Sequence, residues 1–336
     1  MTEDFIESGP YEEVRRSPLP GMIRRTKEAV KTASETLGRE IIWKLNVSNP
    51  SIPRLYTQLK LHKPGRKVRP ITSNNNSPNE KLAQWLLSQF EAMPIKFETA
   101  AIKNTIEFVE KTKDLVLLEG EMQVSFDVES LYPNIPIDVT LQLLEHWLQS
   151  NQLEHEVVRE LVRLTKICMD ENWFRFNDKY YRQNFGCSMG SSLSPFLANL
   201  FVSHFETTLK KEGIFPRVWL RYVDDVYAII KKHQLRSLLK RLNNTKYPTI
   251  KFTHEEEQDG KLNFLDLCVT RNGSKLEYDI YRKPSATDRY ITSDSHHPFE
   301  HKIASFHSML FRAVNVPLKE ERFNTEIQRI KQIANH

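Results

Sequence analysis

The sequence contains few cysteines, and they lie far apart. Three occur in 336 residues, Cys168, Cys187 and Cys268, and no CxxC pair is present. Disulfide frameworks and cysteine-rich zinc sites both depend on paired or closely spaced cysteines. The cysteine pattern therefore argues against both kinds of site and favours a reducing compartment.

Other patterns are also missing. No apolar run approaches the roughly 20 residues that cross a bilayer, and the N-terminus lacks the basic and then apolar stretches of a signal peptide. No glycine-rich loop ends in GK[ST], and HEVVR at His155 does not match HExxH. These absences argue against a P-loop NTPase and a zinc protease. We expect an intracellular soluble protein, or a piece of one, with no membrane partner.

The sequence does contain enough apolar residues for a large core. Hydrophobic residues make up 39% and charged residues 27% of the chain, and 336 residues exceed the roughly 250–300 that one core holds. The net charge is only +5, but KLHKPGRKVR at 60–69 holds five basic residues and no acidic one. Such a run is either a solvated loop or a contact for a partner that carries phosphate.

The spacing of apolar residues predicts an α+β protein. Alternating residues predict a strand within 122–132, and WFRFNDKYYRQ (173–183) predicts a hairpin with an Asn-Asp turn. Ser194 is the predicted N-cap of a helix that ends at Gly213. Further helices are expected over 22–46, 78–90, 138–149, 154–169 and 234–242, an extended linker over 47–56, and three final strands separated by Asp259-Gly260 and Asn272-Gly273. This order does not suit a doubly wound parallel sheet.

The stretch LRYVDDVYAII places two carboxylates between two apolar runs. Residues 218–222 and 226–230 predict two strands joined by a two-residue turn, with Asp224 and Asp225 at its tip. Asp-Asp is a poor choice for such a turn, which favours Asn-Gly or Asp-Gly. Two carboxylates about 4 Å apart also repel by roughly 1–4 kcal/mol, depending on the dielectric constant. Poor turn chemistry together with a charge conflict indicates a functional site that needs a cation.

Asp127 is the third carboxylate of interest, because it lies within the apolar strand of 122–132. Either it faces solvent together with Ser125 and Glu129, or it meets a metal ion or other partner. A strand aspartate opposite an aspartate pair on a hairpin is the arrangement that holds two Mg²⁺ ions for in-line phosphoryl transfer. Asp127, Asp224 and Asp225 are therefore the candidate metal ligands and catalytic residues.

Several motifs in order resemble the core of reverse transcriptases. They are LHKPGRKVRPI, SFDVESLYPNIP, GCSMGSSLSPFLANLF, RYVDD and LNFLDLCV. In detail the chain resembles the Penelope-like retroelement branch, which is related to telomerase, most clearly in IPRLYTQLKLHKPG and YRKPSATDRYITSDSHHPFEHK. The resemblance covers about residues 40–335. It implies a right-hand polymerase with fingers, a palm whose antiparallel sheet packs on helices, and a partial helical thumb.

The resemblance also implies roles for individual residues around the incoming nucleotide. Tyr132 matches the aromatic that stacks under the sugar and blocks a 2′-hydroxyl, so it implies DNA synthesis; its alternative role is core packing. Lys63 or Lys67 and, more firmly, Arg69 match the fingers residues that hold the triphosphate. Met189 and Gly190 match the loop that shapes the nucleotide site, together with Ser194 and Pro195. Many relatives carry Gln where this chain has Met189, so their template discrimination does not carry over.

Two weaker candidates remain open. A lysine near the sheet, Lys251 or Lys261, is a candidate general acid for pyrophosphate, although either is also compatible with an exposed strand lysine. Four histidines resemble a zinc cluster, but Pro298 interrupts their spacing. The resemblance instead implies that this segment leads from palm to thumb and contacts the primer. The four are His296, His297, His301 and His307.

We therefore predict an RNA-directed DNA polymerase that uses two Mg²⁺ ions, with Mn²⁺ as an alternative. Its partners are an RNA template, a DNA primer and dNTPs, gripped mainly through phosphates. The expected domains are an N-terminal helical extension and linker (1–58), fingers and palm (59–280), and a primer-grip region with partial thumb (281–336). The resemblance implies a nuclear location, and the oligomeric state stays open.

Two rival functions are considered. A catalytically inactive scaffold that binds nucleic acid is disfavoured because an idle acidic cluster is an uncompensated repulsion. An RNA-templated RNA polymerase is disfavoured by Tyr132. Penelope-like proteins often carry a C-terminal GIY-YIG endonuclease, which this sequence does not reach by His336. A fragment with an incomplete thumb is therefore a further expectation.

Overall fold

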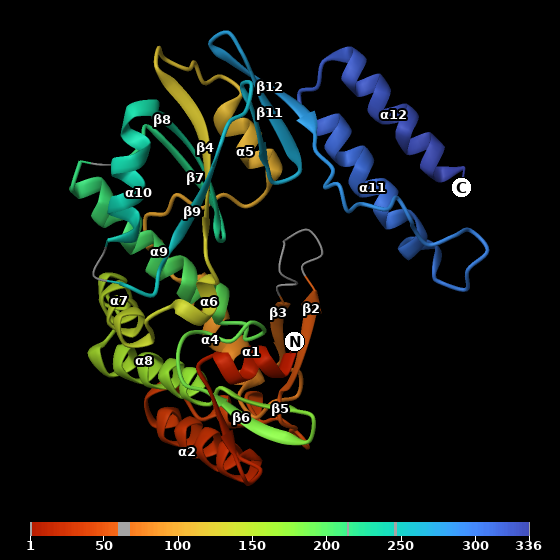
Figure 1. Ribbon diagram of the computed structural model, residues 1–336. Coiled ribbons are helices and arrows are strands. Elements are labelled where there is room, and N and C mark those ends of the chain that lie inside the picture. The colour runs from red at the N-terminus through yellow and green to blue at the C-terminus, as the bar shows by residue number, and fades with distance from the viewer. Residues whose placement is uncertain (1, 60–67, 214, 245–246, 336) are drawn as a thin grey trace. The chain divides into compact units, whose positions relative to one another are not determined.

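The computed structural model in Figure 1 describes residues 2–59, 68–213, 215–244 and 247–335. The chain divides into two compact units, each built from three separate stretches of sequence. Unit 1 contains 1–99, 129–214 and 244–251, and unit 2 contains 100–128, 215–243 and 252–336. The predicted domain boundaries at 58/59 and 280/281 stay a prediction.

Unit 1 is mainly helical, and its helices pack through apolar faces. Helix α8 contacts α2, α4 and α7, and α7 also contacts α9. Phe90 of α4 stacks on Phe196 of α9 at a ring-centroid distance of 5.1 Å and meets Trp147 of α7 edge-on. The helices are α1 (Thr2–Ser8), α2 (Leu19–Leu37), α3 (Glu40–Lys44), α4 (Glu80–Ala92), α6 (Leu131–Asn134), α7 (Ile137–Ser150), α8 (His155–Asp170) and α9 (Ser194–Lys211).

A five-stranded sheet completes unit 1, in the order β1-β6-β5-β2-β3. Its strands are β1 (Tyr11–Val14), β2 (Arg54–Leu59), β3 (Val68–Ser73), β5 (Trp173–Phe176) and β6 (Lys179–Gln183). All pairs are antiparallel except the single parallel bridge between β2 and β5. Asn177 and Asp178 have φ of 44° and 62°, so the predicted Asn-Asp hairpin turn is confirmed.

Unit 2 is built on a four-stranded antiparallel sheet in the order β7-β8-β4-β9. A second, three-stranded antiparallel sheet follows in the order β10-β11-β12, and α5 shares one core with both sheets. The strands are β4 (Glu121–Val128), β7 (Val218–Tyr222), β8 (Asp225–Lys231), β9 (Phe252–Glu256), β10 (Lys261–Phe264), β11 (Leu267–Asn272) and β12 (Lys275–Ile280). The helices are α5 (Thr105–Thr112), η1 (Lys232–Gln234) and α10 (Leu235–Asn243). The predicted α+β class with an antiparallel sheet on helices is confirmed.

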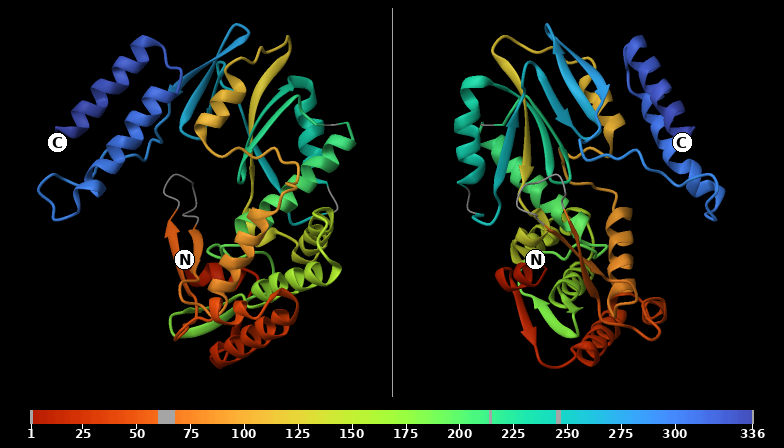
Figure 2. Two further views of the ribbon diagram at one scale, coloured as in Figure 1. Left: turned by 180° about the vertical axis from the view of Figure 1, so that it is seen from behind. Right: turned by 45° about the vertical axis from the view of Figure 1, so that its right-hand side comes forward.

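The last two helices of unit 2 form an antiparallel pair, as both views of Figure 2 show. They are α11 (Phe299–Asn315) and α12 (Glu320–Ala334). Ion pairs connect α12 and the residue before it to the region of β12: Lys319 to Glu277, Arg322 to Asp279, and Arg282 to the buried Glu326. Within the described ranges, no helix is both long and apolar enough to cross a bilayer.

Several local predictions are wrong in detail. Gly38, at φ 98°, divides the predicted helix of 22–46 into α2 and α3, and the expected linker of 47–56 already enters β2 at Arg54. Leu193, not Ser194, is the N-cap of α9, because Ser194 Oγ donates instead to the Ser188 carbonyl at 2.7 Å. Four strands follow α10 where three were expected, since β9 leaves the others to pair with β4.

Candidate active site

The four-stranded sheet of unit 2 aligns the candidate carboxylates in a row. Tyr222 lies opposite Asp225, Asp225 opposite Asp127, and Asp127 opposite Thr253, so one residue comes from each strand. Directly opposed residues project from the same face with Cβ atoms about 4.5–5.5 Å apart. All four side chains are exposed or half-buried. Asp127 and Asp225 therefore share an accessible position at the strand ends.

Further along β4 and β8, part of this sheet face is covered. Gln123 and Tyr227 lie further along the same face, both are fully buried, and the Tyr227 hydroxyl donates to Gln123 Oε1 at 2.9 Å. Tyr227 also packs edge-on against Phe108 of α5 at 4.9 Å. The face thus changes from core to accessible surface within about two residues of Asp127. Asp127 is thus a half-buried carboxylate beside a second one, and its role as a metal ligand stays a prediction.

The hairpin turn itself differs from the prediction. Tyr222 pairs with Asp225, so the two turn residues are Val223 and Asp224, and Asp225 is the first residue of β8. Val223 has φ of 57°, a conformation that costs a β-branched residue about 1–3 kcal/mol. The Val128 amide donates to the Asp224 carbonyl at 3.0 Å and fixes the turn against β4. Backbone strain at this turn supports a functional rather than an ordinary structural turn.

Arg221 is a site residue that sequence analysis missed. It is only 2% exposed, and its Nη1 donates to the carbonyl of the strained Val223 at 3.3 Å. Its backbone is fixed too, because its amide donates to the Ala100 carbonyl and its carbonyl accepts from the Ile102 amide. A buried arginine is rare unless it is paired or hydrogen-bonded. The sequence did contain a sign of this role: Arg221 lies two residues after Trp219, on the strand face where alternation predicts an apolar residue.

The donor chemistry of these residues fits a hard divalent cation, because carboxylate oxygens are the ligands of Mg²⁺. The backbone register brings Asp127 and Asp225 together, and Asp224 is adjacent in the chain. Over the described ranges, however, the side chains form no group of three or more Asp, Glu, His or Cys that could hold a metal ion. The histidines at 296, 297, 301 and 307 are among the described residues, and they too form no such group.

In unit 1 the loop at residues 186–190 packs directly against strand β3. The Thr72 amide donates to the Met189 carbonyl at 2.8 Å, and a Cβ on Gly190 would lie 1.9 Å from the Thr72 carbonyl oxygen. Gly190 also has φ of 142°. Only glycine permits this approach of two backbones. The match of Gly190 to a site-shaping loop thus has a steric reason in this structure.

The N-terminal part of the same loop contacts the backbone at Tyr132. The Cys187 amide donates to the Tyr132 carbonyl at 2.8 Å, and a Cβ on Gly186 would lie 2.2 Å from the Pro133 carbonyl oxygen. Cys187 is fully buried, and this burial raises the pKa of its thiol to about 12. The thiol is therefore protonated at neutral pH and unsuited to act as a nucleophile. Its role in this loop is packing.

Of the candidate phosphate-binding residues, the structure describes only Arg69. Arg69 lies in β3 opposite Gln58 of β2, with an exposed side chain, three residues before Thr72. Lys63 and Lys67 lie outside the residues that the structure describes. Arg69, Met189, Gly190 and Tyr132 are thus linked by one strand and one loop of unit 1. The metal-ligand candidates all belong to unit 2.

The sheet register distinguishes the two candidate general acids, Lys251 and Lys261, by their positions along β4. Lys251 directly precedes Phe252, which pairs with Val128, the residue after Asp127. Lys261 begins β10 and follows Gly260, whose carbonyl accepts a hydrogen bond from the Gln123 side chain at 3.2 Å. Gln123 precedes Asp127 by four residues, or about 13 Å along a strand. The lysine on the side of β4 where Asp127 lies is therefore Lys251.

Comparisons with known proteins agree with this architecture. A family model described as reverse transcriptase (RNA-dependent DNA polymerase) matches residues 61–247, more than half of the chain. The chain belongs to the reverse transcriptase family. A second model, described as an animal helix-turn-helix domain, matches residues 289–336, a range that contains the whole of α11 and α12. A search of curated proteins gave no match.

The fold of this reverse transcriptase is similar to that of telomerases. Telomerase from Candida albicans, solved with a TWJ fragment of telomeric RNA, matches with a TM-score of 0.54 and 12% identity, over 98% of this chain and 64% of the telomerase. Telomerase from Candida tropicalis, solved with the same kind of RNA fragment, matches with a TM-score of 0.51 and 11% identity, over 93% and 56%. The chain thus spans 56–64% of the length of these two proteins. At this identity the likeness concerns the fold.

Proposed function

We propose that this reverse transcriptase is an active RNA-directed DNA polymerase of a Penelope-like retroelement. It extends a DNA primer with dNTPs on an RNA template. The observation that carries the proposal is the accessible pair Asp127 and Asp225, opposite each other across β4 and β8, in a chain of the reverse transcriptase family. Carboxylate oxygens on neighbouring strands are ligands of the kind that Mg²⁺ prefers.

Asp127, Asp224 and Asp225 are the residues that would hold two Mg²⁺ ions. When bound, such ions neutralise the triphosphate and lower the pKa of the attacking 3′-hydroxyl. The protein's own contribution is to fix the carboxylates: β4 fixes Asp127, β8 fixes Asp225, and the Val128 amide and Arg221 hold the turn. Fixed ligands need little reorganisation during the reaction.

The roles of the nucleotide-binding residues in this proposal come from the resemblance. Arg69 binds the triphosphate through its planar guanidinium, which grips phosphate oxygens in pairs. The loop with Met189 and Gly190 positions Tyr132, whose ring lies under the sugar and excludes a 2′-hydroxyl. Lys251, rather than Lys261, protonates the departing pyrophosphate, as its position beside the strand end after Asp127 favours.

The Penelope-like assignment rests on the sequence motifs of residues 52–65 and 281–302. The RNA template is supported by the family description and by the telomerases of similar fold that were solved with RNA. A nuclear location follows from the same resemblance. Template binding through phosphates predicts that affinity falls steeply with salt.

A primer-extension assay tests the proposal against its two rivals. The full chain is given an RNA template annealed to a DNA primer, Mg²⁺, and either dNTPs or NTPs. We expect extension with dNTPs and little with NTPs. Comparable use of NTPs would favour an RNA polymerase and remove the role of Tyr132. Tight primer–template binding without any extension would favour a scaffold.

A further inference from the structure

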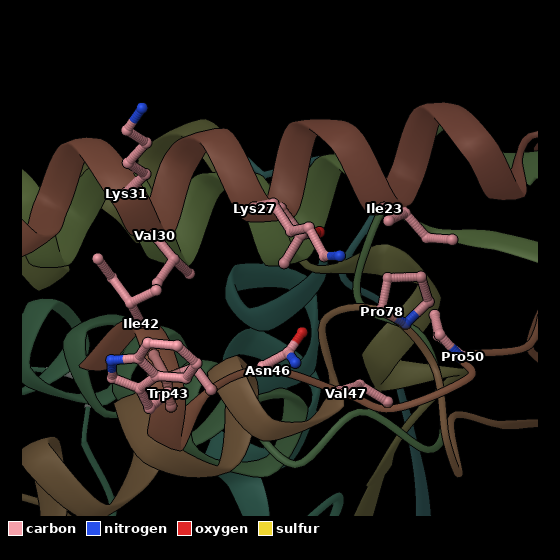
Figure 3. Close-up of a pocket in the computed structure, with 12 residues that line it drawn as sticks. Ile23, Lys27, Val30, Lys31, Ile42, Trp43, Asn46, Val47, Pro50 and Pro78 are labelled. Carbon is pink, nitrogen blue, oxygen red and sulfur yellow. The ribbon is translucent and has the colours of Figure 1, made fainter. Parts of the chain in front are cut away.

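A pocket of unit 1 lies between helix α2 and the segment that follows it, and none of the candidate site residues that the structure describes lines it. Its volume is about 420 Å³, within the roughly 300–1,000 Å³ of small-molecule sites. Figure 3 shows Ile23, Lys27 and Val30 on α2 facing Trp43 and Asn46 across the opening. The pocket is therefore formed by one face of α2, by α3, by residues 45–50 that follow α3, and by Pro78.

The aromatic side of the pocket is unusually exposed. Trp43 is 83% exposed, and the neighbouring Ile42 is 37% exposed. Both belong to α3, and both line the pocket. A tryptophan is normally among the more buried residues, because its indole carries a large apolar area. An indole held open beside a pocket is a surface on which a flat ligand ring can stack.

Polar groups accompany this apolar wall. In Figure 3 the Lys27 side chain and the Asn46 amide extend toward the opening, whereas the Lys31 ammonium points away from it. Thr26 also lines the pocket and is 4% exposed, and within the described part of the chain its Oγ1 has no hydrogen-bond partner. The pocket thus combines one flat apolar surface with amide and ammonium groups.

The charged residues that line the pocket favour an anionic ligand. They are Lys27 and Lys31, and among the described residues that line the pocket none is acidic. A ligand that is both aromatic and anionic fits this site better than an apolar segment of a protein. A nucleotide in a single strand has this chemistry, since its base stacks on aromatics and its phosphates attract lysine.

We propose that this pocket binds an unpaired base of single-stranded nucleic acid, outside the polymerase site. Trp43 stacks on the base, Asn46 hydrogen-bonds to its edge, and Lys27 contacts a flanking phosphate. A base in a duplex is already stacked and paired, so the site selects single strands. The pocket would give the protein a second binding site for a template or product strand, in addition to the polymerase site.

Binding of fluorescein-labelled 12-mers to the full chain tests this proposal without any need for catalysis. Fluorescence anisotropy, with neither dNTPs nor Mg²⁺, compares single-stranded RNA, single-stranded DNA of the same sequence, and the RNA duplex. Trp43→Ala is expected to weaken single-strand binding about tenfold. Trp43→Leu keeps apolar area and loses the ring, so it should resemble Trp43→Ala, whereas Trp43→Phe should stay within about threefold of the unmodified chain. A Trp43 dependence seen with RNA alone assigns the pocket to RNA, and one seen with both assigns it to single strands of either kind.

A charge variant and cross-linking complete the test. Lys27→Gln should lower the slope of log affinity against log salt by about 0.7. RNA that contains 4-thiouridine should cross-link to a peptide containing Trp43. Equal binding by Trp43→Ala and the unmodified chain would overturn the proposal, as would an equal Trp43 dependence with duplex. A loss of binding that tracks a change of oligomeric state in sedimentation would instead assign the face to self-association.

Primer extension on a short duplex with a one-nucleotide overhang separates this pocket from the polymerase site. Such a substrate has no long single strand for the pocket, so Trp43→Ala should extend it at the unmodified rate. If extension fails in both proteins while Trp43 still governs binding, the polymerase proposal fails and the pocket stands.

Discussion

The two units hold their candidate site residues by different means. In unit 2 the carboxylates lie on strand ends, and side-chain groups such as the buried Arg221 guanidinium fix the turn beside them. In unit 1 the loop at 186–190 is fixed by backbone contacts, through the amides of Thr72 and Cys187 and the absence of a Cβ at Gly190. Unit 2 should therefore respond to changes of charge, and unit 1 to changes of backbone shape.

The largest effect on stability is expected from Gly190→Ala. The added Cβ would meet the Thr72 carbonyl oxygen at 1.9 Å, so β3 and the loop must separate. We expect a loss of about 2–4 kcal/mol in the free energy of unfolding, together with weaker dNTP binding. Urea denaturation and the KM for dNTP measure these effects.

Gly213→Ala is the matched control for this prediction. Gly213 also lies in unit 1 with a positive φ of 72°, but a Cβ there meets nothing within 4 Å. Its cost should be only the backbone term of about 1–2 kcal/mol. Equal losses in the two variants would show that contact with Thr72 is unimportant.

Arg221→Met tests the side-chain support in unit 2. Without the guanidinium, the Val223 carbonyl loses its hydrogen bond and the turn that carries Asp224 loosens. Removing a group that orients metal ligands typically costs about 10–100-fold in activity. We expect this loss in kcat with little change in KM for dNTP, and partial recovery in Arg221→Lys. A change in stability alone, with kcat preserved in the folded fraction, would contradict a positioning role.

The ion pair between Glu121 and Arg217 should make unit 2 sensitive to acid. A hydrogen bond from Arg217 lowers the pKa of the buried Glu121 carboxyl. Since the folded pKa lies below the unfolded value, the pair stabilises the protein above the ordinary glutamate pKa, and this contribution is lost as pH falls through the folded pKa.

Glu121→Gln should therefore lower the free energy of unfolding by about 1 kcal/mol at pH 7. The loss is no larger because the Arg217 side chain is partly exposed. The difference from the unmodified chain should shrink as the pH is lowered below 4.5. Urea denaturation at several pH values measures it, and the exposed Glu119→Gln is the control. A difference that stays constant with pH would rule out the charge pair as its cause.

The smallest effect is expected from Val223→Gly. Glycine adopts φ of 57° without the strain of valine, although it loses more entropy on folding, so we expect a net stabilisation of about 1 kcal/mol or less. The turn also becomes looser, and kcat should fall a few-fold. Thermal denaturation and primer extension should thus move in opposite directions. Unchanged kcat would show that the strain has no function.

The sequence predicts the two regions unequally well. Charge conflict and alternation predicted Asp127, Asp224 and Asp225 as candidates, and the structure confirms strands at Asp127 and Asp225. The turn was displaced by one residue, because propensity does not anticipate valine at positive φ. Arg221 was missed because the alternation pattern predicts an apolar residue at its position and gives no role to a charged one. The contacts of Gly186 and Gly190 depend on segments more than 50 residues away, which no local pattern encodes.

The most direct test of the account is the rate of a single dNTP incorporation on an RNA template with a DNA primer, with Asp225→Asn as the comparison. Removing one group that stabilises charge in the transition state costs about 10²–10³-fold in rate. We predict at least that loss, with primer–template affinity unchanged. Equal rates in the two proteins, or binding without incorporation in both, would contradict the assignment of the Asp127–Asp225 row as the polymerase centre.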